Sequence, residues 1–293
     1  MSRYPIILFC LTLLSCKSDL QMLEEKIRKQ LATQEGIFAV AFSDLSTGKT
    51  LLINEHESFH AASTMKTPVM IEVFKQAEEG RWRLSDSVTV INEFKSIVDG
   101  SLYSLSPEDD SEQNLYTLVG KKRTVYDLVY DMIIVSSNLA TNIVIEYVDA
   151  RKVTQTMRDL GAPDIHVLRG VEDIKAFEKG MTNSTTAYDL MVIFEKLAAG
   201  EAVSPEASEE MIKILLDQKF NDLIPAQLPA DVKVAHKTGF ITGVHHDSGI
   251  VMLPDGRRYV LILLSKNMTD MEAGTASLAT ISGLIYDFVV QER

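Results

Sequence analysis

The chain has 293 residues, of which 46% are hydrophobic and 24% are charged, and its formal net charge at pH 7 is −12. This composition is typical of a globular protein with one large domain or two entwined ones. The acidic balance excludes nucleic acid as a partner, because little positive charge is available to neutralise phosphates. The two cysteines are Cys10 and Cys16, so thiol catalysis and a cysteine zinc site elsewhere in the chain are also excluded.

The first sixteen residues have the features of an export signal. Arg3 is followed by the apolar run 6–14, which is too short to cross a bilayer, since that needs about 20 residues. The run ends in LLSC at 13–16, which resembles the lipobox of bacterial lipoproteins. We therefore predict a lipoprotein-type signal peptide over residues 1–15 and a periplasmic or envelope-exposed protein that meets the membrane only through a lipid on Cys16. An ordinary signal peptide and a buried N-terminal strand are the alternatives.

The next segments predict a helix followed by a β-hairpin. Residues 20–34 have apolar side chains at helical spacing. Residues 37–42 form a short apolar run, residues 44–49 are rich in turn formers, and the apolar pattern resumes at 51–53. Two short apolar runs around such a connection are typical of a hairpin.

The middle of the chain is mainly helical in pattern. Helical periodicity is found over residues 68–79, 124–135, 138–149, 153–160, 184–199 and 205–216. Residues 96–123 and 161–183 lack a regular period, and we expect loops there.

The strand pattern returns near the C-terminus. Residues 232–235 predict one strand, and residues 249–253 and 259–264 predict two more, joined by the turn sequence Pro-Asp-Gly. The chain closes with residues 273–290, an apolar helix rich in small side chains.

These elements predict an α/β (α+β) fold. We expect an antiparallel sheet of about five strands, built from both ends of the chain and flanked by the terminal helices. Residues 16–62 and 217–293 would form this α/β domain, and residues 63–216 an inserted all-helical domain. The cleft between the two is the expected position of a functional site.

The stretch HAASTMKTPVM contains the tetrad Ser63-x-x-Lys66. Serine is common at helix N-termini because its oxygen accepts a free backbone N–H, so the tetrad alone decides nothing. If Ser63 opens a helix, as Pro68 nearby supports, Lys66 lies on the same face one turn later. An amine there with a lowered pKa would be able to take the serine proton. The same letters at Ser46-x-x-Lys49 lie in the predicted hairpin turn, where no helix aligns the two side chains.

Two further motifs follow in order along the chain. Ser136 and Asn138 lie between two helical patterns, where a hydroxyl can relay a proton and an amide can hold a substrate amide. Lys237-Thr238-Gly239 follows a strand, and we place it at the end of an edge strand. A lysine and a threonine there suit a carboxylate, while the glycine leaves room for close approach. Each motif alone has an ordinary structural explanation, and the set of three in order makes coincidence improbable.

The three motifs resemble those of class A β-lactamases and related penicillin-binding enzymes. The resemblance covers nearly the whole chain after the signal, with further matches at Asn142 and at residues 124–128, 184–187 and 247–250. It implies an acyl-enzyme mechanism in which Ser63 is the nucleophile, Lys66 its base, and Ser136 the group that passes a proton to the leaving nitrogen.

The resemblance also implies a substrate-binding set. Asn138 would contact the substrate's side-chain amide, and Lys237 with Thr238, next to Gly239, would contact the β-lactam carboxylate. The backbone N–H of Phe240, with that of the nucleophile, would form the oxyanion hole.

Two departures from the family's pattern bear on the function. Ser137 stands where the family usually has an aspartate that braces the loop. Glu172 lies 36 residues after Ser136, close to the family's spacing for the base that activates the deacylating water, but Ala176 stands where an asparagine is usual and no Glu-Pro pair is present. Glu172 is the candidate base, and a solvated loop carboxylate is the alternative.

The loop that carries Glu172 decides what happens to the acyl-enzyme. With a working base, the acyl-enzyme turns over and the protein is a serine β-lactamase. Without one, it is a slowly deacylating penicillin-binding, D,D-peptidase-like or esterase-type hydrolase, or a β-lactam-binding protein without turnover.

Tyr103 is a candidate for the aromatic residue at the cleft entrance.

The implied chemistry needs no metal and no cofactor. His236, His245, His246 and Asp247 are close in sequence, but adjacent histidines on a strand point to opposite faces, which disfavours a shared metal ion. We expect a β-lactam or a cell-wall peptide as the substrate and a monomeric protein.

Overall fold

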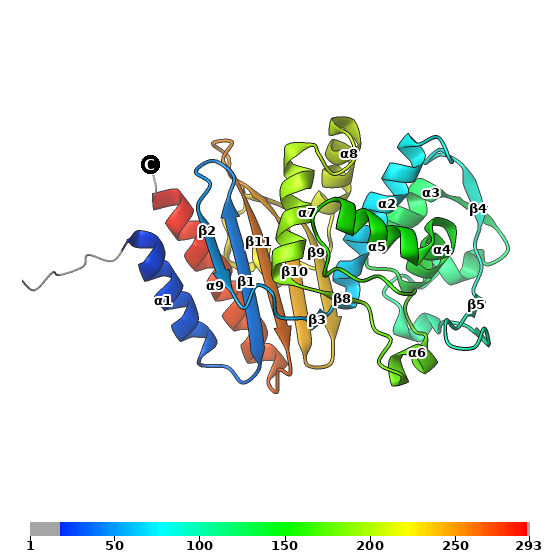
Figure 1. The fold of residues 1–293 in the computed structure, drawn as a ribbon, viewed down its shortest axis with the longest axis horizontal. Helices are drawn as coiled ribbons and strands as arrows, with labels where there is room; N and C mark the ends of the chain where they lie inside the picture. The colour runs from blue at the N-terminus through cyan, green and yellow to red at the C-terminus, as the bar shows by residue number, and fades with distance from the viewer. Residues whose placement is uncertain (1–17, 292–293) are drawn as a thin grey trace, which may run out of the picture.

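The computed structural model describes residues 18–291, and the predicted signal peptide lies outside the described residues. The centre of the fold is a five-stranded antiparallel sheet with the order β2-β1-β11-β10-β9 (Figure 1). Its strands are β1 (Ile37–Asp44), β2 (Thr50–Ile53), β9 (Lys233–Ile241), β10 (Val244–Met252) and β11 (Arg258–Lys266). The predicted antiparallel sheet built from both ends of the chain is confirmed.

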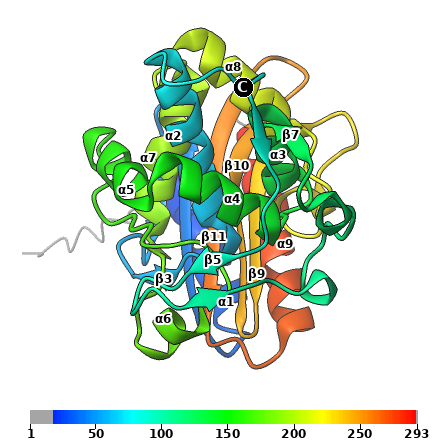
Figure 2. The same cartoon turned by 90° about the vertical axis from the view of Figure 1, so that its right-hand side faces the viewer.

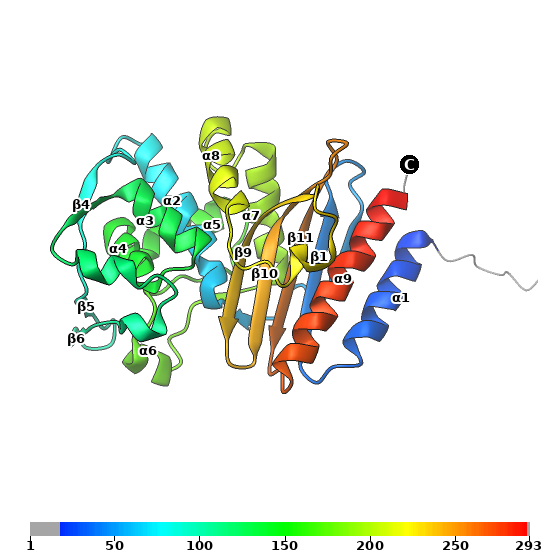
Figure 3. The ribbon, with the colours of Figure 1, turned by 180° about the vertical axis from the view of Figure 1, so that it is seen from behind.

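The two terminal helices lie side by side on one face of this sheet (Figure 3). Helix α1 (Asp19–Leu31) begins after Ser18, whose side chain accepts the backbone N–H of Gln21 in a capping box. Helix α9 (Met271–Gln291) is long and apolar enough to cross a membrane by length and composition alone. One side of this helix, however, is buried in the core against the sheet, through Leu278, Ile281, Ile285 and Val289.

Strand β1 shows how the sheet is covered on both faces. Phe38, Val40 and Phe42 pack with residues of the terminal helices, whereas Ala39 and Ala41 pack with the core of the helical part. Successive side chains of a strand point to opposite faces, so a strand buried on both faces has a continuous apolar run. This is why residues 37–42 lack an alternating pattern.

The helical part covers the other face of the sheet and extends beyond it (Figure 2). Its helices are α2 (Lys66–Glu78), α3 (Val125–Ile134), α4 (Asn138–Val148), α5 (Ala150–Asp159), α6 (Ile174–Glu178), α7 (Ala187–Ala199) and α8 (Pro205–Leu216). Helix α7 lies directly against the sheet, contacting β1, β10 and β11.

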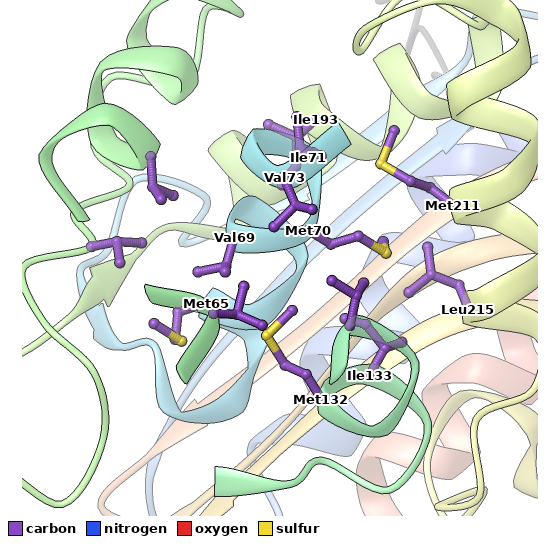
Figure 4. Close-up of a cluster of buried hydrophobic side chains, with 14 of the residues drawn as sticks. Met65, Val69, Met70, Ile71, Val73, Met132, Ile133, Ile193, Met211 and Leu215 are labelled. Atoms are coloured by element: carbon purple, nitrogen blue, oxygen red, sulfur yellow. The ribbon is translucent and has the colours of Figure 1, made fainter. Parts of the chain in front are cut away.

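Helix α2 lies at the centre of the helical part. Met65, Val69 and Met70 are buried beside Met132 of α3 and Met211 of α8 (Figure 4). The helix is buried on nearly all sides, including its polar residues Glu72 and Gln76, as expected of a helix surrounded by other elements. The residues at its start are therefore held by packing around the whole circumference.

Several short elements were not predicted. The small strand pairs are β3 (Phe59–His60) with β8 (Ser184–Thr185), β4 (Ser87–Thr89) with β7 (Lys122–Thr124), and β5 (Phe94–Lys95) with β6 (Leu102–Tyr103). The 3₁₀ helices are η1 (Ala62–Met65), η2 (Pro107–Asp109), η3 (Asn114–Leu118) and η4 (Ile224–Gln227). Elements of two to five residues are too short to establish a period in sequence.

Several predicted boundaries are wrong; the strand predicted over 249–253, for example, begins at Val244. The helix predicted over 184–199 begins only at Ala187, because residues 184–185 pair as a strand and the Thr186 side chain caps the helix by accepting the Asp189 N–H. Strand β9 continues through Gly239 to Ile241, so the Lys-Thr-Gly motif lies within the edge strand rather than at its end. The motif is polar in sequence and does not look like a strand, although the side chains of Lys237 and Thr238 are buried.

Candidate active site

Ser63 lies in the 3₁₀ turn that leads directly into α2. It is half-buried and lines two cavities, of about 330 and 470 Å³, which also share Asn138 and Phe240 and so form adjoining parts of one cleft. The preceding residue, Ala62, has φ +44°, a left-handed conformation that costs on the order of 1 kcal/mol or more for a residue with a Cβ. A strained turn of this kind exposes the serine hydroxyl at the end of a buried helix.

Lys66 is completely buried one turn after Ser63. Its Nζ donates to the Ser136 carbonyl at 2.7 Å, to Ser136 Oγ at 3.1 Å and to Asn138 Oδ1 at 3.0 Å. Burial lowers the pKa of Lys66 to about 7, and the negative charges of Asp110 and Glu172 partly oppose this change. The amine is therefore poised to exchange a proton near neutral pH.

Ser136 lies between the two buried lysines. Its Oγ accepts from Lys66 Nζ and also from Lys237 Nζ, each at 3.1 Å. Burial and the neighbouring charge of Lys66 hold the pKa of Lys237 well below its ordinary value, opposed by Asp247. A hydroxyl hydrogen-bonded to two amines of lowered basicity is well placed to relay a proton.

The edge strand β9 lies against the turn that carries Ser63. A Cβ on Gly239 would lie 3.1 Å from the backbone nitrogen of Ser63 and 3.2 Å from that of Thr64, so glycine allows this close approach without a shift of either backbone. Thr238 lines the cleft, and Phe240 lies at its mouth with 62% of its surface exposed. The structure thus brings all five predicted binding residues, Asn138, Lys237, Thr238, Gly239 and Phe240, to the cleft or directly behind it.

Glu172 reaches the same cleft from the opposite side. Its side chain is exposed and lines the larger cavity together with Ser63, and the Asn138 amide donates to its Oε1 at 3.5 Å. Its φ of +61° is left-handed. Asp173 beside it is buried and accepts hydrogen bonds from the Ser96 hydroxyl at 2.8 Å and the Ile97 N–H at 2.9 Å, which holds the backbone of this loop.

Ala176 lies apart from this contact. It is buried within α6, whose first turn is capped by Asp173. No asparagine therefore reaches the carboxylate of Glu172 from four residues later in the chain, and the amide of Asn138 is the one that contacts it.

Tyr103 is not at the mouth of the cleft. It lines a separate cavity of about 600 Å³ behind the Glu172 loop, together with Asn142 and Gly170. Its hydroxyl donates to the Val171 carbonyl at 3.3 Å and accepts from the Asn142 amide at the same distance. The tyrosine therefore supports the loop from behind.

Besides Asp109, which lines both cavities, sequence reasoning missed Asp110 near the site. Its carboxylate contacts the start of α4, including Ser137 of the second motif, and its charge affects Lys66. In sequence it is one of three consecutive acidic residues in a segment without a period, so nothing distinguished it from a solvated charge.

The histidines near the third motif each have a separate protein partner. The His236 ring lies 2.9 Å from Asp247 Oδ1, the His245 ring 2.8 Å from the Thr275 hydroxyl, and the His246 ring 2.9 Å from the His60 carbonyl. Within residues 18–291, no group of three or more histidine, cysteine or acidic side chains is arranged to hold a metal ion.

Comparison with known proteins places the chain in a family. The sequence model of the "Beta-lactamase enzyme family" matches residues 22–289. The β-lactamase L2 of Stenotrophomonas maltophilia is 27% identical over 229 residues, which cover 77% of this chain and 69% of that protein. The extended-spectrum β-lactamase PER-1 of Pseudomonas aeruginosa is 24% identical over 299 residues, which cover 92% of this chain and 88% of the relative.

Solved structures agree with this assignment. The β-lactamase of Sphaerobacter thermophilus superposes with a TM-score of 0.79 at 25% identity, covering 94% of this chain and all of that one. The protein PBP-A superposes with a TM-score of 0.80 at 26% identity, covering 93% of this chain and 97% of its own. The resemblance seen in the three motifs is confirmed, and the chain belongs to the β-lactamase enzyme family.

Proposed function

We propose that the protein is a serine β-lactamase that opens the β-lactam amide through an acyl-enzyme on Ser63. The observation that carries this proposal is the buried Lys66 amine, which has a lowered pKa and is hydrogen-bonded to Ser136 and Asn138 one turn after an accessible serine. Such a set activates a hydroxyl that is otherwise a weak nucleophile.

Acylation uses three proton transfers. Lys66, as the free amine, takes the proton of Ser63 as Oγ forms a bond to the carbonyl carbon. The oxyanion is stabilised by the backbone N–H groups of Ser63 and Phe240. The C–N bond then breaks, Ser136 gives its proton to the departing nitrogen, and Lys66 returns a proton to Ser136.

Binding uses the residues around the cleft. Lys237 and Thr238 are assigned to the substrate carboxylate, Asn138 to the amide of its side chain, and Gly239 to the close approach of β9. The buried position of Lys237 strengthens a charge interaction, because little water screens it.

Deacylation requires a base for the attacking water, and we assign this role to Glu172. Its neighbours on both sides are held by hydrogen bonds, its side chain faces the cleft, and its carboxylate contacts Asn138. Glu172 takes a proton from the water as its oxygen attacks the acyl carbon. The bond to Ser63 Oγ then breaks, and the proton held by Glu172 returns to the serine oxygen.

One observation favours a second candidate, a slowly deacylating penicillin-binding protein. Glu172 is exposed, and Ala176 offers no second amide to position a water. An acyl-enzyme that forms but persists would then be the end point.

A chromogenic cephalosporin and the purified protein separate these functions. Steady hydrolysis supports the β-lactamase, whereas labelling of Ser63 by one equivalent without turnover supports the second candidate. Ser63→Ala is the matched control. The mechanism is overturned if this variant keeps full activity or if the wild type is never labelled.

We also propose that the protein is exported and anchored in the cell envelope through a lipid on Cys16. The apolar run 6–14 and the LLSC sequence that ends it support this assignment. Metabolic labelling with a fatty-acid analogue is expected to mark the wild type in the membrane fraction. Loss of the label in Cys16→Ser would agree, and an unlabelled wild type would contradict the anchor.

A further inference from the structure

Asp110 is a buried carboxylate, 6% exposed, in the segment between η2 and η3. Its Oδ2 accepts hydrogen bonds from the backbone N–H of Leu139 at 2.8 Å, from the Tyr116 hydroxyl at 2.9 Å and from the Ser137 hydroxyl at 3.4 Å. Its Oδ1 accepts from the Glu112 N–H at 3.1 Å. The carboxylate is therefore held in one orientation by its own segment and turned toward the second motif.

Two of these donors belong to the N-terminus of α4. The first N–H groups of a helix have no acceptor within it, and the positive end of the helix dipole favours a negative charge. Ser137 caps one of them by accepting the Ala140 N–H at 3.2 Å, and Asp110 caps another at Leu139. Asp110 thus supplies at this helix end a charge that Ser137, the middle residue of the motif, lacks.

The helix end that Asp110 holds carries two residues of the site. Ser136 has φ +57°, and a left-handed non-glycine residue persists only where its surroundings fix it. Asn138 is the first residue of α4, and its amide accepts a hydrogen bond from Lys66. A displacement of this end of α4 would move both groups relative to the amine.

We propose that Asp110 is a positioning residue for acylation, which holds the turn of Ser136 and Asn138 by capping α4 from another segment of the chain. The proposal rests on the proposed acylation of Ser63. Asp110, which lies 27 residues before Ser137 in the chain, would then brace this loop in place of the aspartate that the family usually has within the motif.

The charged groups around Lys66 provide a way to distinguish a role of Asp110 in acylation from a role in stability alone. Asp110 and Glu172 are the negative groups, Lys237 on β9 is the positive one, and α4 presents only neutral groups. Removing the charge of Asp110 makes the protonated amine less favourable, so the acid limb of the acylation profile is expected to move to lower pH. A role limited to stability would leave this limb unchanged.

The test is Asp110→Asn, which keeps the shape and removes the charge. The rate constant for acylation by a chromogenic cephalosporin, measured in a single turnover, is expected to fall about 10- to 100-fold, since small misplacements of catalytic groups have effects of this size. Glu108→Gln is the matched control, because Glu108 is an exposed carboxylate two residues earlier, in η2, and it should behave as the wild type. Adding Ser137→Asp to Asp110→Asn returns a carboxylate to the motif and is expected to recover most of the rate, since aspartate is as good an N-cap as serine.

A second measurement does not depend on activity. Hydrogen exchange of the Leu139 amide should be at least tenfold faster in Asp110→Asn than in the wild type and in Glu108→Gln. Acylation within twofold of the wild type with an unmoved acid limb overturns the proposal, even if thermal stability falls. A wild type that is not acylated at all refutes the proposed function instead, and the exchange at Leu139 then decides whether Asp110 holds α4.

Discussion

The side chain of Asn142 holds the backbone of Val171 by two hydrogen bonds. Its Oδ1 accepts the Val171 N–H at 2.6 Å and its Nδ2 donates to the Val171 carbonyl at 3.0 Å. Asn138 lies one turn earlier on the same helix and contacts both Lys66 and Glu172. One face of α4 therefore links the acylating amine to the loop of the proposed deacylating base.

Gly170→Ala tests this link. A Cβ at this position would lie 2.3 Å from Asn142 Oδ1, so the Asn142 side chain or the loop must shift, and the contact between them is disturbed in either case. We expect an unfolding free energy lower by about 1–3 kcal/mol, the usual effect of overpacking. Deacylation should slow at least tenfold while acylation changes less, because the displaced residue is next but one to Glu172. Single-turnover and steady-state rates separate the two steps, and an equal loss in both would argue against a link specific to Glu172.

Glu172→Gln addresses the base directly. The amide cannot accept a proton from water, so the acyl-enzyme should accumulate while acylation stays largely intact. Intact-mass measurement after mixing with a penicillin is expected to show one added equivalent on Ser63 that persists. Glu178→Gln, at the exposed end of α6, is a control that should turn over as the wild type. Unchanged turnover in Glu172→Gln would mean that another group activates the water.

The three motifs were predictable because each keeps its residues within four consecutive positions of the chain. The terminal location of Ser63 followed from the apolar pattern after it, and the hairpin around Pro254-Asp255-Gly256 followed from turn chemistry. The sheet was equally accessible, since apolar runs at both ends of the chain had no other partner to cover them.

The contacts that depend on the path of a loop were not predictable. Asp110 is recognised only when its carboxylate is seen under α4, and Gly170 only when Asn142 is seen against it. The extent of β9 was underestimated for a related reason. Lys237 is fully buried, with Lys66 and Asp247 as its charged neighbours, whereas a lysine in a sequence normally indicates a solvent-exposed position.

The buried pair of His236 and Asp247 is expected to be essential for stability. Asp247 also accepts the backbone N–H groups of Ile224 at 3.0 Å and Ser248 at 2.9 Å. Asp247→Ala removes the partner of these two N–H groups and of His236 Nδ1, so we expect a loss of about 3–5 kcal/mol in unfolding free energy by urea denaturation. Asp255→Ala, at an exposed turn, should cost under 1 kcal/mol and is the comparison. A similar small loss in both variants would contradict the structural role.

The rate of acylation should follow the protonation of Lys66. Because its pKa is lowered to about 7, the free amine predominates above neutral pH and the ammonium below it. The single-turnover rate is therefore expected to rise with pH through an apparent pKa near 7 and then level off. A rate that is flat from pH 5 to pH 9 would mean that Lys66 is not the base.

The same shift predicts how stability depends on pH. The ordinary pKa of lysine is 10.5, so between pH 7 and that value the unfolded chain binds a proton at Lys66 that the folded protein does not. In this range the contribution of Lys66 raises the unfolding free energy by up to about 1.4 kcal/mol per pH unit. The cost of burying the protonated amine reaches its full size only below pH 7. Lys66→Met removes the titration, so the variant should gain most over the wild type near pH 7, and the difference should shrink by roughly 4 kcal/mol by pH 10. Urea denaturation of both proteins across this range measures the change, and a constant difference would show that burial does not lower the pKa of Lys66.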